Sequence, residues 1–89
     1  MPLRQNAALS RFELDVEGGV AFANYRIRDG VMSITHTEVP QALRERGVGA
    51  RLVRATLEAA RAQGFKVRPL CSFARAYVDR HPEFADLTA

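Results

Sequence analysis

Three strand-like segments separated by glycine-containing turns constrain this sequence more than any other feature. Residues 11–17 alternate strictly between apolar and charged side chains, which is the pattern of a half-buried strand. Gly18-Gly19 and Asp29-Gly30 are hairpin-turn dipeptides that bring the chain back on itself. They separate the first segment from residues 20–28 and 31–39, the last of which is rich in β-branched side chains. The sequence therefore predicts an antiparallel meander of three strands.

The period of the apolar residues changes after Pro40. Residues 41–47 show little alternation and several charges, so we expect a loop. Beyond it the apolar positions follow helical spacing, at Val48, Leu52, Val53, Thr56, Leu57 and Ala60. Gly64 lies where a helix C-terminus favours a left-handed residue. The spacing predicts a helix from Val48 to this glycine.

A second strand–helix unit completes the chain. Residues 65–70 are predicted to form a short strand, and Ser72 is a plausible N-cap for a helix. The buried face of that helix is expected to comprise Phe73, Ala76 and Tyr77, and residues 81–84 are expected to end it.

The predicted order is β-β-β-α-β-α, a mixed α+β fold. A helix joins the third and fourth strands, as it does between parallel neighbours. Pro69 cannot donate to a ladder, so it belongs at a strand end or where the neighbouring strand diverges. We expect residues 1–10 to be a loosely ordered lead-in and residues 11–89 to form a single domain.

Composition indicates a cytoplasmic protein of one domain. The chain has 89 residues, 47% of them hydrophobic and 26% charged, within the range of ordinary globular domains. One cysteine leaves no internal disulfide, so a reducing compartment is expected. No apolar run approaches the ~20 residues that span a bilayer, and residues 1–8 lack the apolar core of a secretory signal. No membrane partner is expected.

The positive charge does not point to nucleic acid. The net charge is +3, and nearly all the basic residues are arginines dispersed among acids. Such a pattern is typical of a solvated surface, so nucleic-acid binding is not the favoured function. Two distant histidines and one cysteine do not make a zinc site, so no metal is expected.

Two glycines before the first helix are candidates for an anion site. Gly47 and Gly49 allow close approach of backbone N–H groups at a helix N-terminus, where the dipole attracts negative charge. The alternative is that they only make a sharp turn. A dinucleotide fingerprint would need a third glycine where Leu52 stands, and no Walker A sequence is present. What remains is Arg-x-x-Gly-x-Gly, beginning at Arg44.

This pattern resembles the acyl-coenzyme A signature of the GNAT superfamily of N-acetyltransferases. The motif here is Arg44-x-x-Gly47-x-Gly49, after a strand and opening a helix. Residues 36–40 (His-Thr-Glu-Val-Pro), Cys71 and residues 81–84 (His-Pro-Glu-Phe) also resemble the small YjdJ-type acetyltransferases. The likeness runs from about residue 11 to the end. It implies a GNAT-like fold and transfer of an acetyl group from acetyl-CoA to an amine.

The resemblance also implies where the coenzyme lies. The pyrophosphate of CoA would sit on the signature loop that begins at Arg44. The backbone amides that hold the pyrophosphate would be those of Arg46, Gly47, Val48, Gly49 and Ala50. The third strand would splay from residues 65–70, and pantetheine would bond to the backbone of Glu38 and Val39 between them. Compared with a full-length GNAT domain, the chain lacks the helices after the first strand and the terminal strand pair. The acceptor side is therefore expected to be open or completed by a partner, for instance in a homodimer.

Two residues near the last helix are catalytic candidates. Tyr77 occupies the position where GNAT enzymes often carry a tyrosine acid that protonates the leaving thiolate. The alternative is a core tyrosine on the buried helix face. Cys71 precedes a helix N-terminus, which can favour its thiolate and make it a nucleophile. It could instead shape the thioester pocket or be a small buried hydrophobe, since direct transfer needs no nucleophile.

His36 and Glu38 form a second candidate pair. The period of two places both on one face of the third strand, where they could relay a proton from the acceptor amine. The structural interpretation is a buried, hydrogen-bonded pair, which we favour for His36, while Glu38 stays a candidate base. Two other functions remain open: a CoA-binding module without turnover, and a basic nucleic-acid binder.

Overall fold

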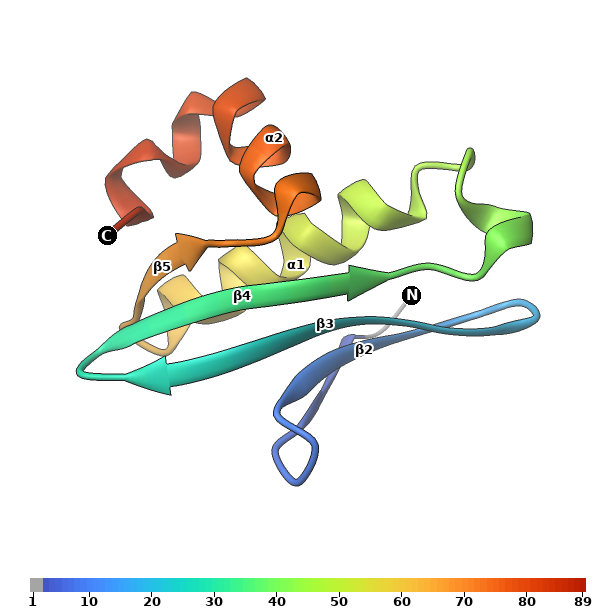
Figure 1. The fold of residues 1–89 in the computed structure, drawn as a ribbon, viewed down its shortest axis with the longest axis horizontal. Coiled ribbons are helices and arrows are strands. Elements are labelled where there is room, and N and C mark those ends of the chain that lie inside the picture. Colours follow the sequence, from blue (N-terminus) through green and yellow to red (C-terminus); the bar gives the residue numbers. More distant parts are fainter. Residues whose placement is uncertain (1–2) are drawn as a thin grey trace.

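One five-stranded sheet with helices packed against it forms the structure, a computed structural model that describes residues 3–89 (Figure 1). The strands lie in the order of the sequence: β1 (Leu3–Asn6), β2 (Arg11–Val16), β3 (Gly19–Arg28), β4 (Val31–Glu38) and β5 (Lys66–Pro69). The α-helices are α1 (Val48–Ala62) and α2 (Ser72–Arg80), and the 3-10 helices are η1 (Gln41–Leu43) and η2 (Pro82–Leu87).

The strand pairings confirm the predicted meander and the mixed α+β class. Neighbouring strands from β1 to β4 are antiparallel, and β4 and β5, joined through α1, are parallel. The turn between β3 and β4 holds Asp29 and Gly30 at φ of 53° and 77°. Two successive positive φ values define the twisted hairpin turn that an Asp-Gly dipeptide favours. The predicted bounds agree with the structure to within one or two residues for these elements.

The prediction of a loosely ordered lead-in is wrong over the described residues. Leu3–Asn6 forms β1, an edge strand antiparallel to β2 with Leu3 opposite Leu14 and Asn6 opposite Arg11. Residues 1 and 2 lie outside the described residues. Because β1 is short and mostly polar, its own side chains give no period from which a strand could be predicted.

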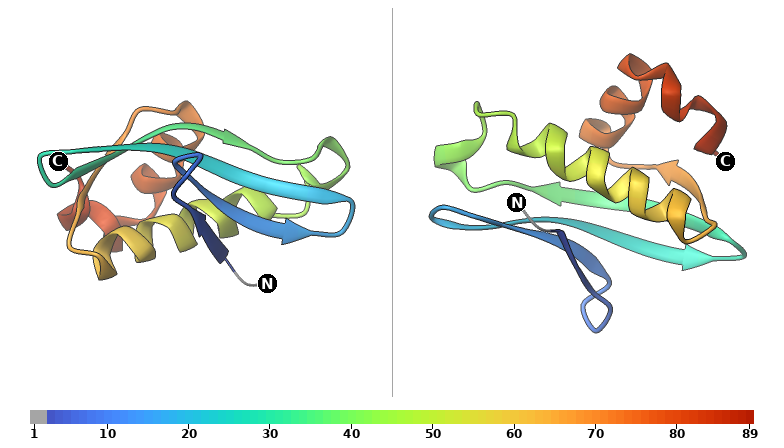
Figure 2. Two further views of the ribbon diagram at one scale, coloured as in Figure 1. Left: turned by 90° about the horizontal axis from the view of Figure 1, so that it is seen from below. Right: turned by 180° about the vertical axis from the view of Figure 1, so that it is seen from behind.

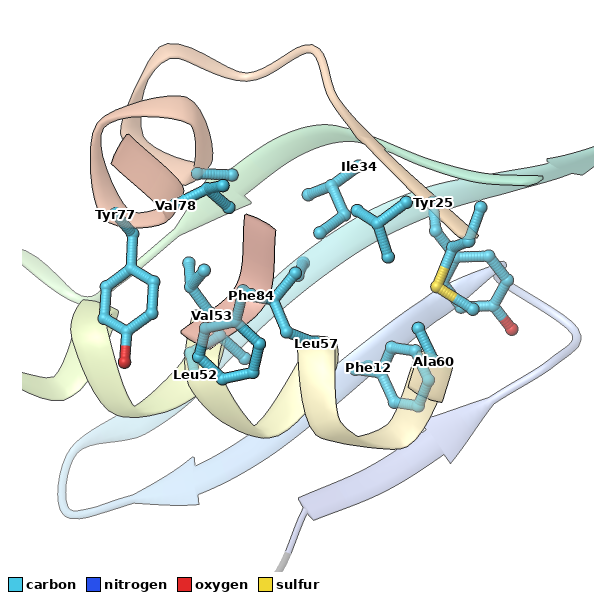
Figure 3. Packing of buried hydrophobic residues seen from close by; sticks show 14 of the residues in the cluster. Phe12, Tyr25, Ile34, Leu52, Val53, Leu57, Ala60, Tyr77, Val78 and Phe84 are labelled. Atoms are coloured by element: carbon cyan, nitrogen blue, oxygen red, sulfur yellow. The ribbon is translucent and has the colours of Figure 1, made fainter. Parts of the chain in front are cut away.

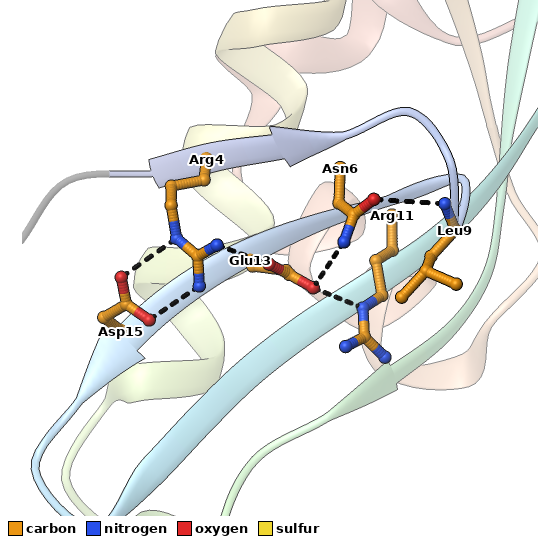
Figure 4. Close-up of polar contacts among 6 residues, drawn as sticks. All are labelled: Arg4, Asn6, Leu9, Arg11, Glu13 and Asp15. Carbon is orange, nitrogen blue, oxygen red and sulfur yellow. Dashed lines mark hydrogen bonds and ion pairs between the residues drawn. The ribbon is translucent and has the colours of Figure 1, made fainter.

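A polar network around Glu13 fixes β1 on β2 (Figure 4). The Glu13 side chain is almost fully buried, yet it accepts bonds from Arg11 Nε at 2.6 Å and Asn6 Nδ2 at 3.2 Å. Arg4 Nη1 lies 2.8 Å from the other carboxylate oxygen, and Arg4 also bonds both oxygens of Asp15. A buried carboxylate needs such partners. These contacts between strands therefore stabilise β1, an edge strand that local propensity does not predict.

The core lies between the sheet and α1, which runs along one face of it (Figures 2 and 3). All the positions predicted to face inward on α1 are buried, which confirms its amphipathic spacing. Gly64 follows with φ of +83°, as its place after the helix predicts. Helix α2 and η2 cover the flank of α1, with Tyr77, Val78 and Phe84 closing the core (Figure 3).

The face that α2 buries differs from the predicted one. Its buried residues are Ala74, Tyr77 and Val78, whereas Phe73 is 46% exposed and Ala76 is half-buried. Only the tyrosine of the predicted face is correct. The observed face, counted from Ala74, and the predicted face, counted from Phe73, have the same spacings of three and four residues. Sequence periodicity alone therefore could not choose between the two faces.

The two ends of α2 also depart from expectation. The N-cap is Cys71 rather than Ser72, and no side chain caps this helix by a hydrogen bond. At the other end His81 is the C-cap, as expected, but η2 follows, and Thr88 then forms a parallel bridge to Val67. The backbone N–H of Ala89 donates to Val67 O at 2.8 Å. One bridge thus extends the β5 edge.

Candidate functional site

β4 and β5 diverge partway along their length. They pair only from Val31 opposite Lys66 to Ile34 opposite Pro69. The next two amides along the chain, of Leu70 and Cys71, both donate to Ile34 O at 3.0 Å, and the chain then turns into α2. Pro69 therefore occupies the last pair before the strands part, as predicted for a residue without an N–H.

A groove opens beyond this divergence. It has a volume of ≈ 270 Å³ and lies among the end of β4, the loop before α1 and the first turn of α2. We call it the splay groove; it is lined by Thr37, Glu38, Val39, Arg44, Gly49 and Phe73. Four of these six were predicted to contact the coenzyme, and Thr37 and Phe73 were not.

A β-bulge at Thr35 decides which side chains of β4 face the helices. Ile34 lies opposite Tyr25, but the residue opposite Ala23 is Thr37, three positions later on β4. Directly opposite residues share a face of an antiparallel pair. Since Tyr25 and Ala23 are both buried on the helix side, the bulge brings Thr37 to that side, where strict alternation would have turned it away.

The same bulge turns His36 and Glu38 to the other face of the sheet. They lie opposite Asn24 and Phe22, and their side chains are 55% and 51% exposed. His36 Nε2 and Glu38 Oε2 are 3.8 Å apart, so the prediction that they share a face is confirmed. The interpretation of a buried hydrogen-bonded pair is wrong, because the bulge moves both outward.

Cys71 and Thr37 meet across the divergence. Cys71 Sγ lies 3.4 Å from Thr37 Oγ1, and the thiol is half-buried. Burial, the largest single influence, raises the pKa of Cys71, but hydrogen bonds from Thr37 and from the backbone amides of Ala74 and Phe73 together outweigh it. The net pKa lies below the usual thiol value, as expected at a helix N-terminus.

The loop before α1 presents a row of backbone amides. Gly47 has φ of +73°, a left-handed conformation that glycine adopts without strain. The first bond into the helix is from Arg51 N to Gly47 O at 3.2 Å, so the amides of residues 47–50 have no partner within the helix. Arg46 N is already engaged by Leu43 O at 3.1 Å. The row available to an anion is therefore one residue shorter than the resemblance implied.

The two glycines of the motif serve different purposes. Gly49 has ordinary helical geometry, but a Cβ added there would lie 2.8 Å from Cζ of the Phe73 ring. The absence of a side chain at Gly49 thus admits the ring of α2 against the first turn of α1. Sequence reasoning assigned both glycines to anion approach and missed this contact, which no sequence period reveals.

Arg44 ties the loop to the end of β4. Its Nε donates to Val39 O at 3.1 Å, and both residues line the splay groove. One backbone acceptor that the resemblance assigned to pantetheine is therefore engaged by a side chain of this loop. The bond places Arg44 and Val39 together on the wall of the groove.

Tyr77 lies outside the splay groove. It is 7% exposed, its hydroxyl accepts a bond from Arg54 Nη1 at 3.1 Å, and its ring stacks on His81 with centroids 3.8 Å apart. It lines a separate groove between α1 and α2. The structure therefore joins Cys71 with Thr37 at the divergence but does not bring Tyr77 to them.

A metal-binding cluster and a membrane-spanning helix are both absent from residues 3–89. No group of three or more His, Cys, Asp and Glu side chains is arranged to hold a metal ion. No helix in this part of the chain is both long enough and apolar enough to cross a membrane.

Comparison with known proteins identifies the family. The sequence model described as GCN5-related N-acetyltransferase matches residues 11–87. The NMR solution structure of a proposed GCN5-like N-acetyltransferase from Staphylococcus aureus is similar, with a TM-score of 0.75 and 30% identity over 99% of this chain and 87% of that one. The search of curated proteins gave no match. The chain belongs to the GCN5-related N-acetyltransferase family.

Proposed function

We propose that this protein binds acetyl-CoA along the splay groove and the loop before α1, and transfers the acetyl group to an amine. One observation carries the proposal: the groove left by the parting of β4 and β5 adjoins the amides of residues 47–50, which have no hydrogen-bond partner within residues 3–89. A ligand with a pyrophosphate and a long amide-bearing arm matches this combination of an anion site and an open strand edge.

The two arms of the site have distinct roles in binding. The amides of residues 47–50 and the positive end of the α1 dipole attract the pyrophosphate. The edge of β4 past Ile34 has no β5 partner within residues 3–89, so pantetheine amides can bond to it as an added strand would. The hydrogen bond from Arg44 to Val39 O links the loop to the residue that follows β4.

Direct transfer is the simpler chemistry. A neutral amine attacks the thioester carbonyl carbon, the C–S bond of the tetrahedral intermediate breaks, and the proton lost by the amine ends on the CoA sulfur. Backbone N–H groups of the β4 edge past Ile34, where β5 no longer pairs with it, are suited to the oxyanion. Glu38 is among the residues that line the groove, although its side chain lies on the face of β4 away from Cys71. It stays the candidate base, with His36 3.8 Å away on the same face.

An acetyl-enzyme route would use Cys71. Its thiolate would attack the acetyl carbon, CoA would leave as thiolate, and the amine would then take the acetyl group from the Cys71 sulfur. The lowered pKa of the thiol and its contact with Thr37 support a reactive sulfur. Mass spectrometry of the protein after incubation with acetyl-CoA distinguishes the routes, since only this one adds an acetyl group to Cys71.

A CoA-binding module without turnover is the second candidate. The observation that favours it is the exposure of His36 and Glu38 on the face away from Cys71, which leaves the helix side of the groove without a carboxylate from β4. Isothermal titration with acetyl-CoA, followed by an assay of CoA release over amines and peptides, separates the cases. Binding with amine-dependent release supports transfer; binding with no release supports the module; no binding contradicts both.

A further inference from the structure

The face of the sheet that is turned away from α1 has no role in the coenzyme binding proposed above (Figure 2). In β4 and β5 the side chains of Met32, Ile34 and Val67 are buried on the side of α1. Since successive residues of a strand point to opposite faces, their neighbours in the chain lie on the other side. We call that side the outer face; it presents Val31, Ser33, Lys66 and Arg68, none of which is buried.

Two arginines lie on either side of Ser33 on the outer face. Arg26 of β3 is opposite Ser33 of β4, and Ser33 is in turn opposite Arg68 of β5. Residues paired across neighbouring strands share a face, and two strand spacings put the two arginine backbones roughly 10 Å apart. Arg28, two residues after Arg26, lies on the same face. We call Arg26, Arg28 and Arg68 the basic cluster.

The charge of the basic cluster is scarcely compensated. Arg26 and Arg68 are exposed and form no ion pair with any residue in the described range 3–89. Arg28 lies 3.9 Å from Asp29, and both of these side chains are almost fully exposed. By contrast, the arginines of β1 and β2 on this face both pair with Glu13. The basic cluster is therefore the part of the outer face that favours negatively charged groups.

The basic cluster lies beside the point where β4 and β5 part. Arg68 immediately precedes Pro69, which forms the last pair of the two strands. Cys71, near which the proposed thioester would lie, follows at once. The splay groove is enclosed by the loop before α1 and the first turn of α2, and the proposed coenzyme fills it. The acceptor amine therefore has the outer face as its open approach to the thioester.

The outer face also carries a carboxylate suited to the amine itself. His36 and Glu38 lie there, 3.8 Å apart and past the last β4–β5 pair. Glu38 is opposite Phe22, which is four residues from Arg26 on β3, a separation of about 13 Å along the strand. The face thus offers a negative group to an ammonium at one end and positive groups to carboxylates at the other.

We propose, resting on the proposed acetyl transfer, that the acceptor is an amino group on an acidic peptide segment. Its carboxylates bind the basic cluster while the amine lies at His36 and Glu38. Small molecules bind in concave sites, whereas the basic cluster lines neither the splay groove nor the groove between α1 and α2. A separation of about 13 Å equals about four residues of extended chain, so the acids lie within about four positions of the acceptor residue.

The chemistry is the direct transfer described above. The amine nitrogen forms a bond to the acetyl carbon, the C–S bond breaks, and the proton lost by the amine ends on the CoA sulfur. The basic cluster touches none of these atoms. Its arginines select the acceptor by charge and are not catalytic residues.

The test is the rate of CoA release from acetyl-CoA with three peptides of equal length. Each has blocked ends and one central lysine, flanked on both sides by glutamates, by glutamines or by arginines. The wild type is expected to have a kcat/KM roughly fivefold or more higher for the glutamate peptide than for the glutamine peptide, and lowest for the arginine peptide. The difference should lie in KM and shrink as salt is added.

Arg26→Gln with Arg68→Gln should raise the KM for the glutamate peptide to about that for the glutamine peptide. Titration of this double variant with acetyl-CoA checks that it is folded. Arg61→Gln is the control for the loss of charge itself and is compared with Arg68→Gln alone. Arg61 lies on α1, on the other side of the sheet, where it pairs with Asp86. This control should keep the wild-type ratio between the peptides.

Equal kcat/KM of the wild type for the three peptides overturns the inference and leaves acetyl transfer standing. A preference for the arginine peptide, or CoA release with small amines but with none of the peptides, overturns it as well. A preference for the glutamate peptide that survives the double substitution also overturns it, because the acids are then recognised elsewhere. Absence of CoA release with every peptide and every amine contradicts the proposed transfer itself.

Discussion

The ring of Phe73 lies against Gly49, so closely that a Cβ at that position would come within 2.8 Å of the ring's Cζ. The contact joins the first turn of α1 to the first turn of α2. It also places one aromatic side chain on the walls of both grooves. The second glycine of the motif is therefore a packing requirement between two helices.

Gly49→Ala is expected to change stability little in the wild type, because the helix-propensity gain of alanine is offset by displacement of the half-exposed ring. In a Phe73→Ala background the same change should stabilise the protein by up to about 1 kcal/mol. Urea unfolding of the wild type, the two single variants and the double variant forms a double-mutant cycle. The expected coupling free energy is about 1 kcal/mol. Additive effects would contradict the contact.

Gly47→Ala is expected to destabilise the protein by about 1 kcal/mol, because alanine must adopt a φ of +73°. Gly64→Ala is its matched control: φ there is +83°, and both positions have open space around the missing side chain. The two variants should unfold at similar urea concentrations. Only Gly47→Ala should weaken acetyl-CoA binding. An equal loss of acetyl-CoA affinity in both variants would mean that the loop before α1 has no special role in binding.

Thr37→Val is expected to raise the pKa of Cys71. The bond from Thr37 lowers that pKa, so its removal leaves burial less opposed. The rate of alkylation by iodoacetamide, followed against pH, should have its midpoint at higher pH than in the wild type. Thr88→Val, the same change at a threonine bonded to Ala85 O, should leave the midpoint in place. A midpoint that does not move in Thr37→Val would exclude the hydrogen bond as a cause.

Glu13→Gln is expected to flatten the acid dependence of stability. The bond from Arg11, the largest influence, lowers the pKa of Glu13 from its ordinary value of 4.5 in the folded protein. The unfolded chain therefore takes up the proton first, and the stabilisation is complete above about pH 4.5 and lost as pH falls through the lower folded pKa. Urea unfolding at neutral and acid pH measures the slope.

Asp29→Asn is the control for that slope, since Asp29 is exposed and lies 3.9 Å from its partner Arg28. It should unfold with the acid dependence of the wild type. An unchanged slope in Glu13→Gln would mean that the network on β1 does not depend on the ionised carboxylate.

Local chemistry made most of the fold predictable. The alternation of β2, the Asp29-Gly30 turn and the spacing of α1 each depend on a few neighbouring residues, and all three predictions are confirmed. Strand β1 was missed because its stability comes from Glu13 and its arginine partners on another strand. The face of α2 was wrong because packing against α1, and not its own period, selected it.

The site was predictable only where it is local. The loop of Gly47 and the divergence at Pro69 follow from residues whose backbone limits are known in advance. The bulge at Thr35 leaves no mark in the sequence, and it decides that Thr37 rather than His36 faces Cys71. Cytoplasmic location, the YjdJ-type likeness and the catalytic roles stay predictions.

The central claim is that the first-turn amides of α1 and the end of β4 hold acyl-CoA. Two-dimensional 1H–15N NMR of this 9.9 kDa chain during titration with acetyl-CoA tests it most directly. The account predicts the largest shift changes at the amides of residues 47–50 and 37–39, with little change in β1 and β2. Saturation with acetyl-CoA that leaves the 47–50 amides unshifted, or that moves residues of another surface instead, would contradict it.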